Sequence, residues 1–294
     1  MSSLLTNASA MTALQTLSLT NKNMATTQNR IATGERVSGA SDNAAYWSIA
    51  TTMRSDNKAI SSVQDSLGLG AGKVDTAYTG MNAAIEVVDE IKQKLVSAIG
   101  ASAGDREKIQ TEVSEFLGQL AGIAQSANYA GSNLLANAGD ATADLSIVSS
   151  YNRAADGTVT VEKLAVVAAD SQLTAADGTF AGLLAGFDAM DDTGISAAAD
   201  DAAIEAFLST VETALTSMTE AASTLGASKK RIDMQADFTS KLSDAIERGV
   251  GQLVDADMNA ESARLSALQT QQQLGIQALS IANQSSQNIL SLFR

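Results

Sequence analysis

Two stretches of the chain carry residues whose types and spacing could support chemistry, and the first is glycine-rich. Residues 68–74 read Gly-Leu-Gly-Ala-Gly-Lys-Val, which is close to a phosphate-binding loop. Three residues separate Gly68 from Gly72, however, and Val74 stands where a Ser or Thr would hold magnesium, so the spacing does not fit. We therefore interpret these glycines as positions of close helix packing.

The second stretch is acidic. Asp188, Asp191 and Asp192 could bind a hard cation through carboxylate oxygens, but the full calcium-loop pattern is missing and a solvated acidic loop is the preferred interpretation. The 294 residues include no His and no Cys, which removes the usual zinc ligands and nucleophile–base pairs. No carboxylate pair can be identified as a glycosidase site. We expect no enzyme activity, no metal and no cofactor.

The charge and hydropathy of the chain limit its partners. A net charge of −14 and a pI near 4.3 argue against nucleic acid, whose phosphates require Lys and Arg. No apolar run approaches the ~20 residues of a membrane span. Residues 1–20 contain no Lys or Arg and so lack the basic start of a secretory signal. Composition favours a cytosolic protein, with export by a route that reads no cleavable signal as the alternative.

The elements that would position any such residue are long helices, and the most regular runs from Tyr46 to Ile99. Every seventh residue of this stretch is apolar, and the row three residues later is mostly small, with Asp56 as its exception. A strict seven-residue repeat is typical of a helix that supercoils against partner helices. The first row consists of Tyr46, Met53, Ile60, Leu67, Val74, Met81, Val88 and Leu95. At ~1.5 Å per residue this helix would be about 80 Å long, so it must lie against other helices.

Apolar spacing predicts further helices on both sides of this one. Residues 105–127 form a second helix that Asp105 caps, and Ser41-Asp42 is a plausible cap for the long helix. Residues 202–253 provide the natural partner of the long helix, with Phe238 on the packing row. Residues 1–31 and 258–294 are amphipathic but diluted with amides; Asn21 and Gln28 fall on the row of the former. Two such marginal ends suggest segments that order only on assembly.

The stretch 139–199 differs in composition from the helices. Residues 145–149 and 158–161 are β-branched, and Asp156-Gly157 between them is a hairpin turn signal. Residues 164–167 are a possible third strand. We interpret the rest of the stretch, rich in Ala, Gly and Asp, as a small surface insert.

Specific motifs at both ends resemble the bacterial flagellins. Residues 29–37 (NRIATGERV) and 40–45 (ASDNAA) look like the N-terminal signature of that family, including Arg30, Gly34, Arg36, Asp42, Asn43, Ala44 and Ala45. Residues 282–284 and 287–294 resemble its C-terminal ending, and residues 128–135 resemble the segment after its second helix. The resemblance covers about 1–138 and 200–294, and residues 40–54 are closest to flagellins of the alphaproteobacterial type.

The resemblance implies a mainly α fold: a long antiparallel helical bundle with a small β-hairpin insert, whose N- and C-terminal helices pair in a filament core. The implied domains are an inner terminal coiled coil (1–40 with 255–294), a helical rod (41–138 with 200–254) and the insert (139–199). The implied function is a structural subunit that self-assembles into the helical flagellar filament, the propeller for swimming.

Two sets of residues are expected to carry this function. The rod core would consist of Met53, Ile60, Leu67, Val74, Met81, Val88 and Leu95. The terminal assembly surface would consist of Leu14, Leu17, Met24, Ile31, Leu265, Leu268, Leu279, Ile289, Leu290, Phe293 and Arg294.

The resemblance also implies partners and a location. These are further copies of the chain, other co-assembling flagellins, an export chaperone on the C-terminal helix, and hook-associated and cap proteins. The location would be the extracellular flagellum, reached without a cleaved signal peptide. A hook–filament junction protein and an acidic cytoplasmic coiled-coil scaffold remain as alternatives.

Overall fold

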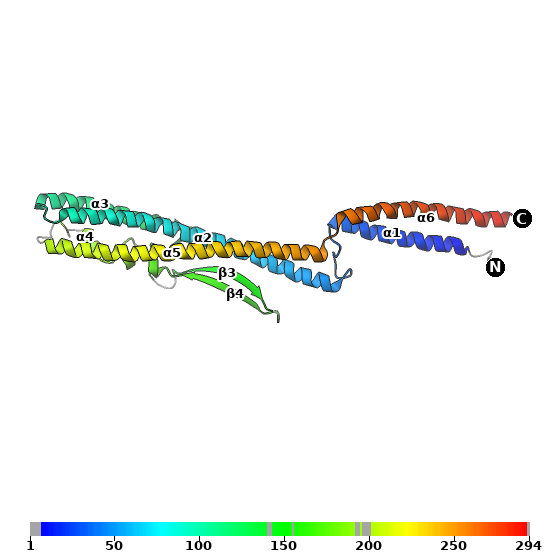
Figure 1. The fold of residues 1–294 in the computed structure, drawn as a ribbon, viewed down its shortest axis with the longest axis horizontal. Helices are drawn as coiled ribbons and strands as arrows, with labels where there is room; N and C mark the ends of the chain where they lie inside the picture. The colour runs from blue at the N-terminus through cyan, green and yellow to red at the C-terminus, as the bar shows by residue number, and fades with distance from the viewer. Residues whose placement is uncertain (1–6, 140–142, 155, 192–194, 196–200, 293–294) are drawn as a thin grey trace. The chain divides into compact units, whose positions relative to one another are not determined.

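The computed structural model describes residues 7–139, 143–154, 156–191, 195 and 201–292, and omits the side chains of residues 191 and 285–292. Its long helices are α1 (Ala8–Thr33), α2 (Ala44–Ala98), α3 (Ala103–Ser126), α5 (Asp201–Val254) and α6 (Met258–Leu292) (Figure 1). The short elements are β1 (Asn128–Tyr129), β2 (Ser132–Asn133), β3 (Leu145–Arg153), β4 (Val159–Val166), η1 (Ala169–Ser171), η2 (Gly182–Leu184) and α4 (Asp188–Asp191).

The chain divides into two compact units, which are residues 58–243 and residues 1–57 together with 244–294. In the first unit, α2, α3 and α5 pack side by side around one apolar core (Figure 1). The heptad row of α2 is buried from Ile60 to Leu95, whereas Met53 is half-buried and Tyr46 is exposed. The repeat therefore marks the face of α2 that its own chain covers over most of its length.

Helix α3 begins earlier than the sequence suggested. Its N-cap is Ser102, and Asp105 lies in the first turn, where its carboxylate accepts a hydrogen bond from Ser102 Oγ at 2.8 Å. The prediction that Asp105 caps this helix was wrong. The carboxylate still complements the helix dipole from that turn.

The hairpin of β3 and β4 is antiparallel, with the predicted turn at Asp156-Gly157, where Gly157 has a φ of 87°. The third strand expected at 164–167 was wrong, because Leu164 to Val166 continue β4 and pair with β3. A bulge between Val148 and Ser150 breaks the ladder. At the bulge Val148 N donates to Ser66 Oγ of α2 (3.2 Å), and Gln235 Nε2 of α5 donates to Ser149 O (2.9 Å), so the irregularity docks the hairpin on both helices.

Two of the three glycines of residues 68–74 pack closely, but not against a helix, whereas an added methyl group at Gly68 would meet nothing within 4 Å. A methyl group added at Gly70 would lie 2.7 Å from Cγ1 and 2.9 Å from Cγ2 of Ile147, on β3. One added at Gly72 would lie 2.9 Å from the ring of Tyr129, on β1. The prediction of close helix packing was therefore wrong in its partners: Gly70 and Gly72 pack against strands, and Gly68 lies against nothing.

The segment between the hairpin and α5 contributes large buried side chains that composition had not indicated, among them Leu173, Leu184, Phe187 and Met190. Gln110 of α3 anchors the segment, since its side chain donates to Met190 O (2.7 Å) and accepts from Ile195 N (2.9 Å). The stretch 139–199 therefore contributes side chains to the core, and its interpretation as a surface insert was incomplete. The solvated acidic loop was wrong in its secondary structure, because Asp188 and Asp191 lie in α4; Asp188 is exposed as expected, and Asp192 lies outside the described residues.

In α5 the packing row differs from the expected one after Ile232. Phe238 is 58% exposed, and Thr239 is buried in its place. Thr239 Oγ1 donates to Gln235 O at 2.7 Å, which satisfies the hydroxyl within the helix and allows its burial. The placement of Phe238 on the packing row was wrong.

Candidate assembly interface

The terminal helices α1 and α6 pack against each other within the second unit (Figure 1). Asn7 caps α1, where its Oδ1 accepts from Ala10 N at 3.0 Å, and its Nδ2 donates to Ala282 O of α6 at 3.0 Å. Gly34 ends α1 with a φ of 73°, a left-handed conformation that glycine adopts without strain. One residue at each end thus fixes the length of α1.

The covered face of α1 follows a 3/4 spacing through Ala10, Ala13, Leu17, Thr20, Met24, Thr27 and Ile31. The prediction placed Asn21 and Gln28 on this face, but both are exposed, and Thr20 and Thr27 are buried there instead. Thr20 Oγ1 donates to Thr16 O at 3.0 Å, which satisfies its hydroxyl as at Thr239. The face is therefore a regular heptad row with two threonines in it.

The facing row of α6 runs from Glu261 through Leu265, Leu268, Gln272, Gly275 and Leu279 to Ala282, and includes the predicted Leu265, Leu268 and Leu279. Gly275 lets α1 approach closely, because an added methyl group would lie 3.3 Å from Leu17 Cδ1. Gln272 Nε2 donates to Asn21 Oδ1 at 2.9 Å at the edge of the row. Among the described side chains, Ala10, Thr20 and Thr27 of α1 and Glu261 and Leu268 of α6 are the buried ones, so few large apolar residues of this pair are fully enclosed.

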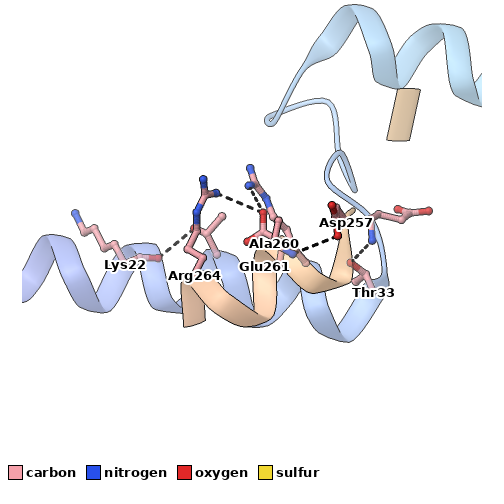
Figure 2. A network of polar contacts seen from close by, with 9 residues as sticks. Lys22, Thr33, Asp257, Ala260, Glu261 and Arg264 are labelled. Atoms are coloured by element: carbon pink, nitrogen blue, oxygen red, sulfur yellow. Dashed lines mark hydrogen bonds and ion pairs between the residues drawn. The ribbon is translucent and has the colours of Figure 1, made fainter. Parts of the chain in front are cut away.

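A charged cluster fixes the register of the two helices (Figure 2). Glu261, with 9% of its side chain exposed, accepts from Arg30 NH1 of α1 at 3.1 Å and from Arg264 NH1 of α6 at 3.4 Å. Asp257 Oδ1 caps α6 through Asn259 N and Ala260 N, and Thr33 Oγ1 accepts from Glu35 N (Figure 2). A cation on α1 thus reaches a nearly buried carboxylate on α6, which selects one alignment.

The link between α1 and α2 holds the rest of the signature residues. Arg36 N and Val37 N both donate to Val254 O, and Arg36 NH2 donates to Leu253 O at 3.0 Å. Asn43 caps α2, because its Oδ1 accepts from Ala45 N and Tyr46 N at 3.1 Å, while Ala44 begins the helix. The expectation that Ser41-Asp42 caps α2 was therefore wrong.

Asp42 instead closes a turn inside the link. Its carboxylate accepts from Ser38 N at 3.1 Å, Gly39 N at 3.3 Å and Ser38 Oγ at 3.2 Å. These backbone bonds, from Ser38 first and Gly39 next, lower the pKa of Asp42 below its ordinary value of 3.8. The ionised form of Asp42 thus stabilises the turn.

The predicted assembly residues fall into two groups. Leu17, Met24, Ile31, Leu265 and Leu279 are half-buried and Leu268 is buried in the pairing of α1 and α6, whereas Leu14 is exposed. The structure describes the backbone but not the side chains of Ile289 and Leu290, and Phe293 and Arg294 lie outside the described residues.

Sequence reasoning missed the apolar residues of the outer faces. Met11 and Leu19 on α1, and Leu274, Ile276 and Ile281 on α6, are each more than half exposed. The sequence could have indicated these residues, because they are large and apolar and lie off the packing row of an amphipathic helix. Together with Leu14, these six residues form what we call the outer apolar set. What this arrangement offers chemically is burial of aliphatic surface.

No helix within the described part of the chain is long and apolar enough to cross a membrane.

Comparison with known proteins identifies the family. A model of the bacterial flagellin N-terminal helical region matches residues 4–140, and one of the C-terminal helical region matches residues 208–293. Flagellin of Brucella melitensis biotype 1 is 58% identical over 294 residues, and Flagellin C of Rhizobium meliloti is 49% identical over 321; each match covers all of both chains.

A solved structure of a flagellar hook-associated protein from Vibrio parahaemolyticus covers 73% of this chain and all of its own, with a TM-score of 0.54 and 15% identity. At that identity the likeness concerns the fold alone, so it does not favour a hook-associated role. The full-length relatives and the two helical-region models agree with the paired terminal helices and the helical body, and the chain belongs to the bacterial flagellins, the structural subunits of the flagellar filament.

Proposed function

We propose that this chain polymerises because neighbouring copies cover the outer apolar set of α1 and α6. The observation that carries the proposal is the exposure of six large apolar side chains on two helices in which Leu268 is the one large apolar residue that is buried among the described side chains. A soluble helix pair normally carries charge on its outer face. The residues of α1 include two charged side chains, Lys22 and Arg30, and those of α6 include two, Glu261 and Arg264.

The energetic argument is additive. Covering a side chain that is half exposed contributes about 1 kcal/mol, and six of them are present in each copy. The pairing of α1 and α6 is marginal by itself, so these helices become stably ordered when neighbouring copies enclose them. Residues 289–294 are proposed to extend the same surface, in line with the family resemblance.

The proposal includes finer points of location and partners. The filament is extracellular, and the subunit is exported without a cleaved signal peptide. An export chaperone holds the C-terminal helix before assembly, which fits the exposed Leu274, Ile276 and Ile281. Hook-associated and cap proteins contact the ends of the polymer, and other flagellins co-assemble with it.

The test compares variants of exposed apolar residues. Leu274→Ser combined with Ile281→Ser should raise the critical concentration for polymerisation more than tenfold, because both side chains are 58% and 69% exposed on α6. Val96→Ser, at a residue 52% exposed on α2, is the matched control and should change the critical concentration less than twofold. Far-UV circular dichroism of the monomers should be unchanged in both variants.

A truncation provides the second arm. Deleting residues 282–294 should leave unfolding of the helical body unchanged and abolish polymerisation. Normal filaments from the truncated chain, or an equal effect of the control, would contradict the proposal.

A further inference from the structure

Both Asp-Gly pairs of the chain lie in the same pentapeptide. The sequence Ala-Ala-Asp-Gly-Thr occurs at residues 154–158 and again at residues 175–179, and the chain contains no Asn-Gly pair. Asp-Gly and Asn-Gly are the dipeptides in which a backbone nitrogen most readily attacks the preceding side chain, because glycine leaves that nitrogen unshielded. Every such pair in this chain is thus followed by a threonine.

The two pentapeptides fold into the same turn. In each, the glycine N donates to the O of the first alanine at 3.0 Å, and the N of that alanine donates to the threonine O at 2.8 Å. Gly157 and Gly178 have φ values of 87° and 91°, a left-handed conformation in which other residues are strained. One turn joins β3 to β4 and the other lies between η1 and η2, so the pentapeptide itself sets this geometry.

The threonine of each turn binds the aspartate carboxylate twice. Asp156 Oδ1 accepts from Thr158 Oγ1 at 2.6 Å and from Thr158 N at 2.9 Å. Asp177 Oδ1 accepts from Thr179 Oγ1 at 2.7 Å and from Thr179 N at 3.1 Å. These bonds, from the hydroxyl first and the backbone N–H next, lower the pKa of each carboxyl below its ordinary value of 3.8.

Isoaspartate formation requires the groups that these bonds engage. The glycine nitrogen attacks Cγ of the neutral carboxyl, the N–Cγ bond forms, and the carboxyl hydroxyl leaves as water with the N–H proton. Hydrolysis of this cyclic imide adds water back at one of its two carbonyls, which gives either aspartate or isoaspartate. In both turns the carboxyl is held in its ionised form by threonine and the glycine N–H is bonded to alanine, so both reactants are restrained.

We propose that Asp156 and Asp177 are the principal sites of isoaspartate formation in this chain, and that Thr158 and Thr179 suppress the reaction while the turns are folded. The left-handed turn requires glycine after each aspartate, and the threonine offsets the chemical instability of that pair. The side chains of all four residues are exposed, so burial does not protect them. The inference concerns the single chain and does not depend on polymerisation.

The two sites differ in what the reaction would damage. Isoaspartate adds one methylene to the main chain and would break the turn. Asp156 lies at the tip of the exposed hairpin, whereas the turn at Asp177 connects the buried Leu173 with Phe180, which packs against the same core. Isoaspartate at Asp177 should therefore lower the urea midpoint of the monomer, while isoaspartate at Asp156 should leave it nearly unchanged.

The test follows isoaspartate at each site by peptide mass spectrometry while the full chain is incubated at neutral pH. Thr158→Val should raise the rate at Asp156 about fivefold and leave the rate at Asp177 unchanged, and Thr179→Val should do the reverse, because each removes one hydroxyl hydrogen bond. Thr158→Ser and Thr179→Ser should keep the slow rate, since serine can make the same bond. Valine variants with the native rates would overturn the inference.

A matched control and an unfolded reference complete the test. Thr160→Val changes an exposed threonine of β4 whose hydroxyl donates to Asn152 O at 3.4 Å, and it should alter neither rate. In concentrated urea, where the turns are absent, the native chain and all variants should form isoaspartate at one common and faster rate. Variants that differ from the native chain as much in urea as in the folded state would overturn the assignment of the suppression to the folded turns.

Discussion

Replacing Gly70 with alanine should destabilise the monomer, although alanine is the better helix former. Gly70 lies inside α2 and is buried, and its Cα faces Ile147 on β3. A methyl group there would approach Cγ1 at 2.7 Å and Cγ2 at 2.9 Å. Because both atoms are attached to the Cβ of a β-branched side chain whose χ1 is stiff, moving them away requires a less favourable rotamer or a shift of the strand.

The magnitude follows from two opposing terms. Alanine gains about 1 kcal/mol over glycine in a helix interior. Overpacking a core position costs about 1–3 kcal/mol. Gly70→Ala should therefore destabilise by about 1 kcal/mol. At Gly68, two residues away and exposed, an added methyl group meets nothing within 4 Å, and Gly68→Ala should stabilise by about 1 kcal/mol.

The assay is urea unfolding of the monomer, followed by circular dichroism at 222 nm. The two variants should differ by about 2 kcal/mol, or about 1 M in midpoint at an m value of about 2 kcal/mol/M. In an Ile147→Ala background, Gly70→Ala should become neutral or stabilising, because the blocking atoms are removed. Equal stabilisation by both alanine substitutions in the native background would refute the close packing of α2 on β3.

Three further predictions concern the second unit. Arg30→Ala should weaken the pairing of the terminal helices by about 1–3 kcal/mol, and Arg264→Ala by less than about 0.5 kcal/mol. The reason is that the side chain of Arg30 is 28% exposed beside Glu261, whereas that of Arg264 is 60% exposed. The critical concentration for polymerisation of each variant measures the difference, and equal critical concentrations would contradict it. Asn43→Ala should cost about 1 kcal/mol through loss of the cap of α2, measured by urea unfolding, and an unchanged midpoint would contradict it. Because the pKa of Asp42 is lowered in the folded protein, its ionised carboxylate stabilises the turn fully above pH 3.8, and this stabilisation is lost as pH falls through the lower pKa of the folded state. Asp42→Asn should remove this acid dependence from amide exchange in the link between α1 and α2. An unchanged pH profile of exchange would contradict the prediction.

The heptad repeat predicted the long elements well because their burial depends on spacing alone. The row from Ile60 to Leu95 is continuous and apolar, so its covered face was evident from the sequence. The same reasoning failed at Thr20 and Thr239, which are buried although polar. Each hydroxyl bonds the carbonyl four residues earlier, a contact that hydrophobic patterning does not consider.

Local turns and an irregular segment account for the remaining differences. Asp42 and Asp105 are both good caps by residue type, but Asp42 is engaged by the turn at Ser38, and α3 begins two residues before Asp105. Phe187 and Met190 lie in an irregular segment with no periodicity, so their burial could not be inferred from spacing. The outer apolar set was visible in the sequence, but only the helix pairing separates it from the packing row.

Hydrogen exchange by mass spectrometry, on monomer and polymer of the full chain, tests the central claim most directly. Amides of α1 and α6 should exchange rapidly in dilute monomer and become protected in the polymer, while those of α2 between Ile60 and Leu95 should be protected in both states. Terminal helices that are already protected in the monomer, or that stay unprotected in the polymer, would contradict the claim that neighbouring copies order them.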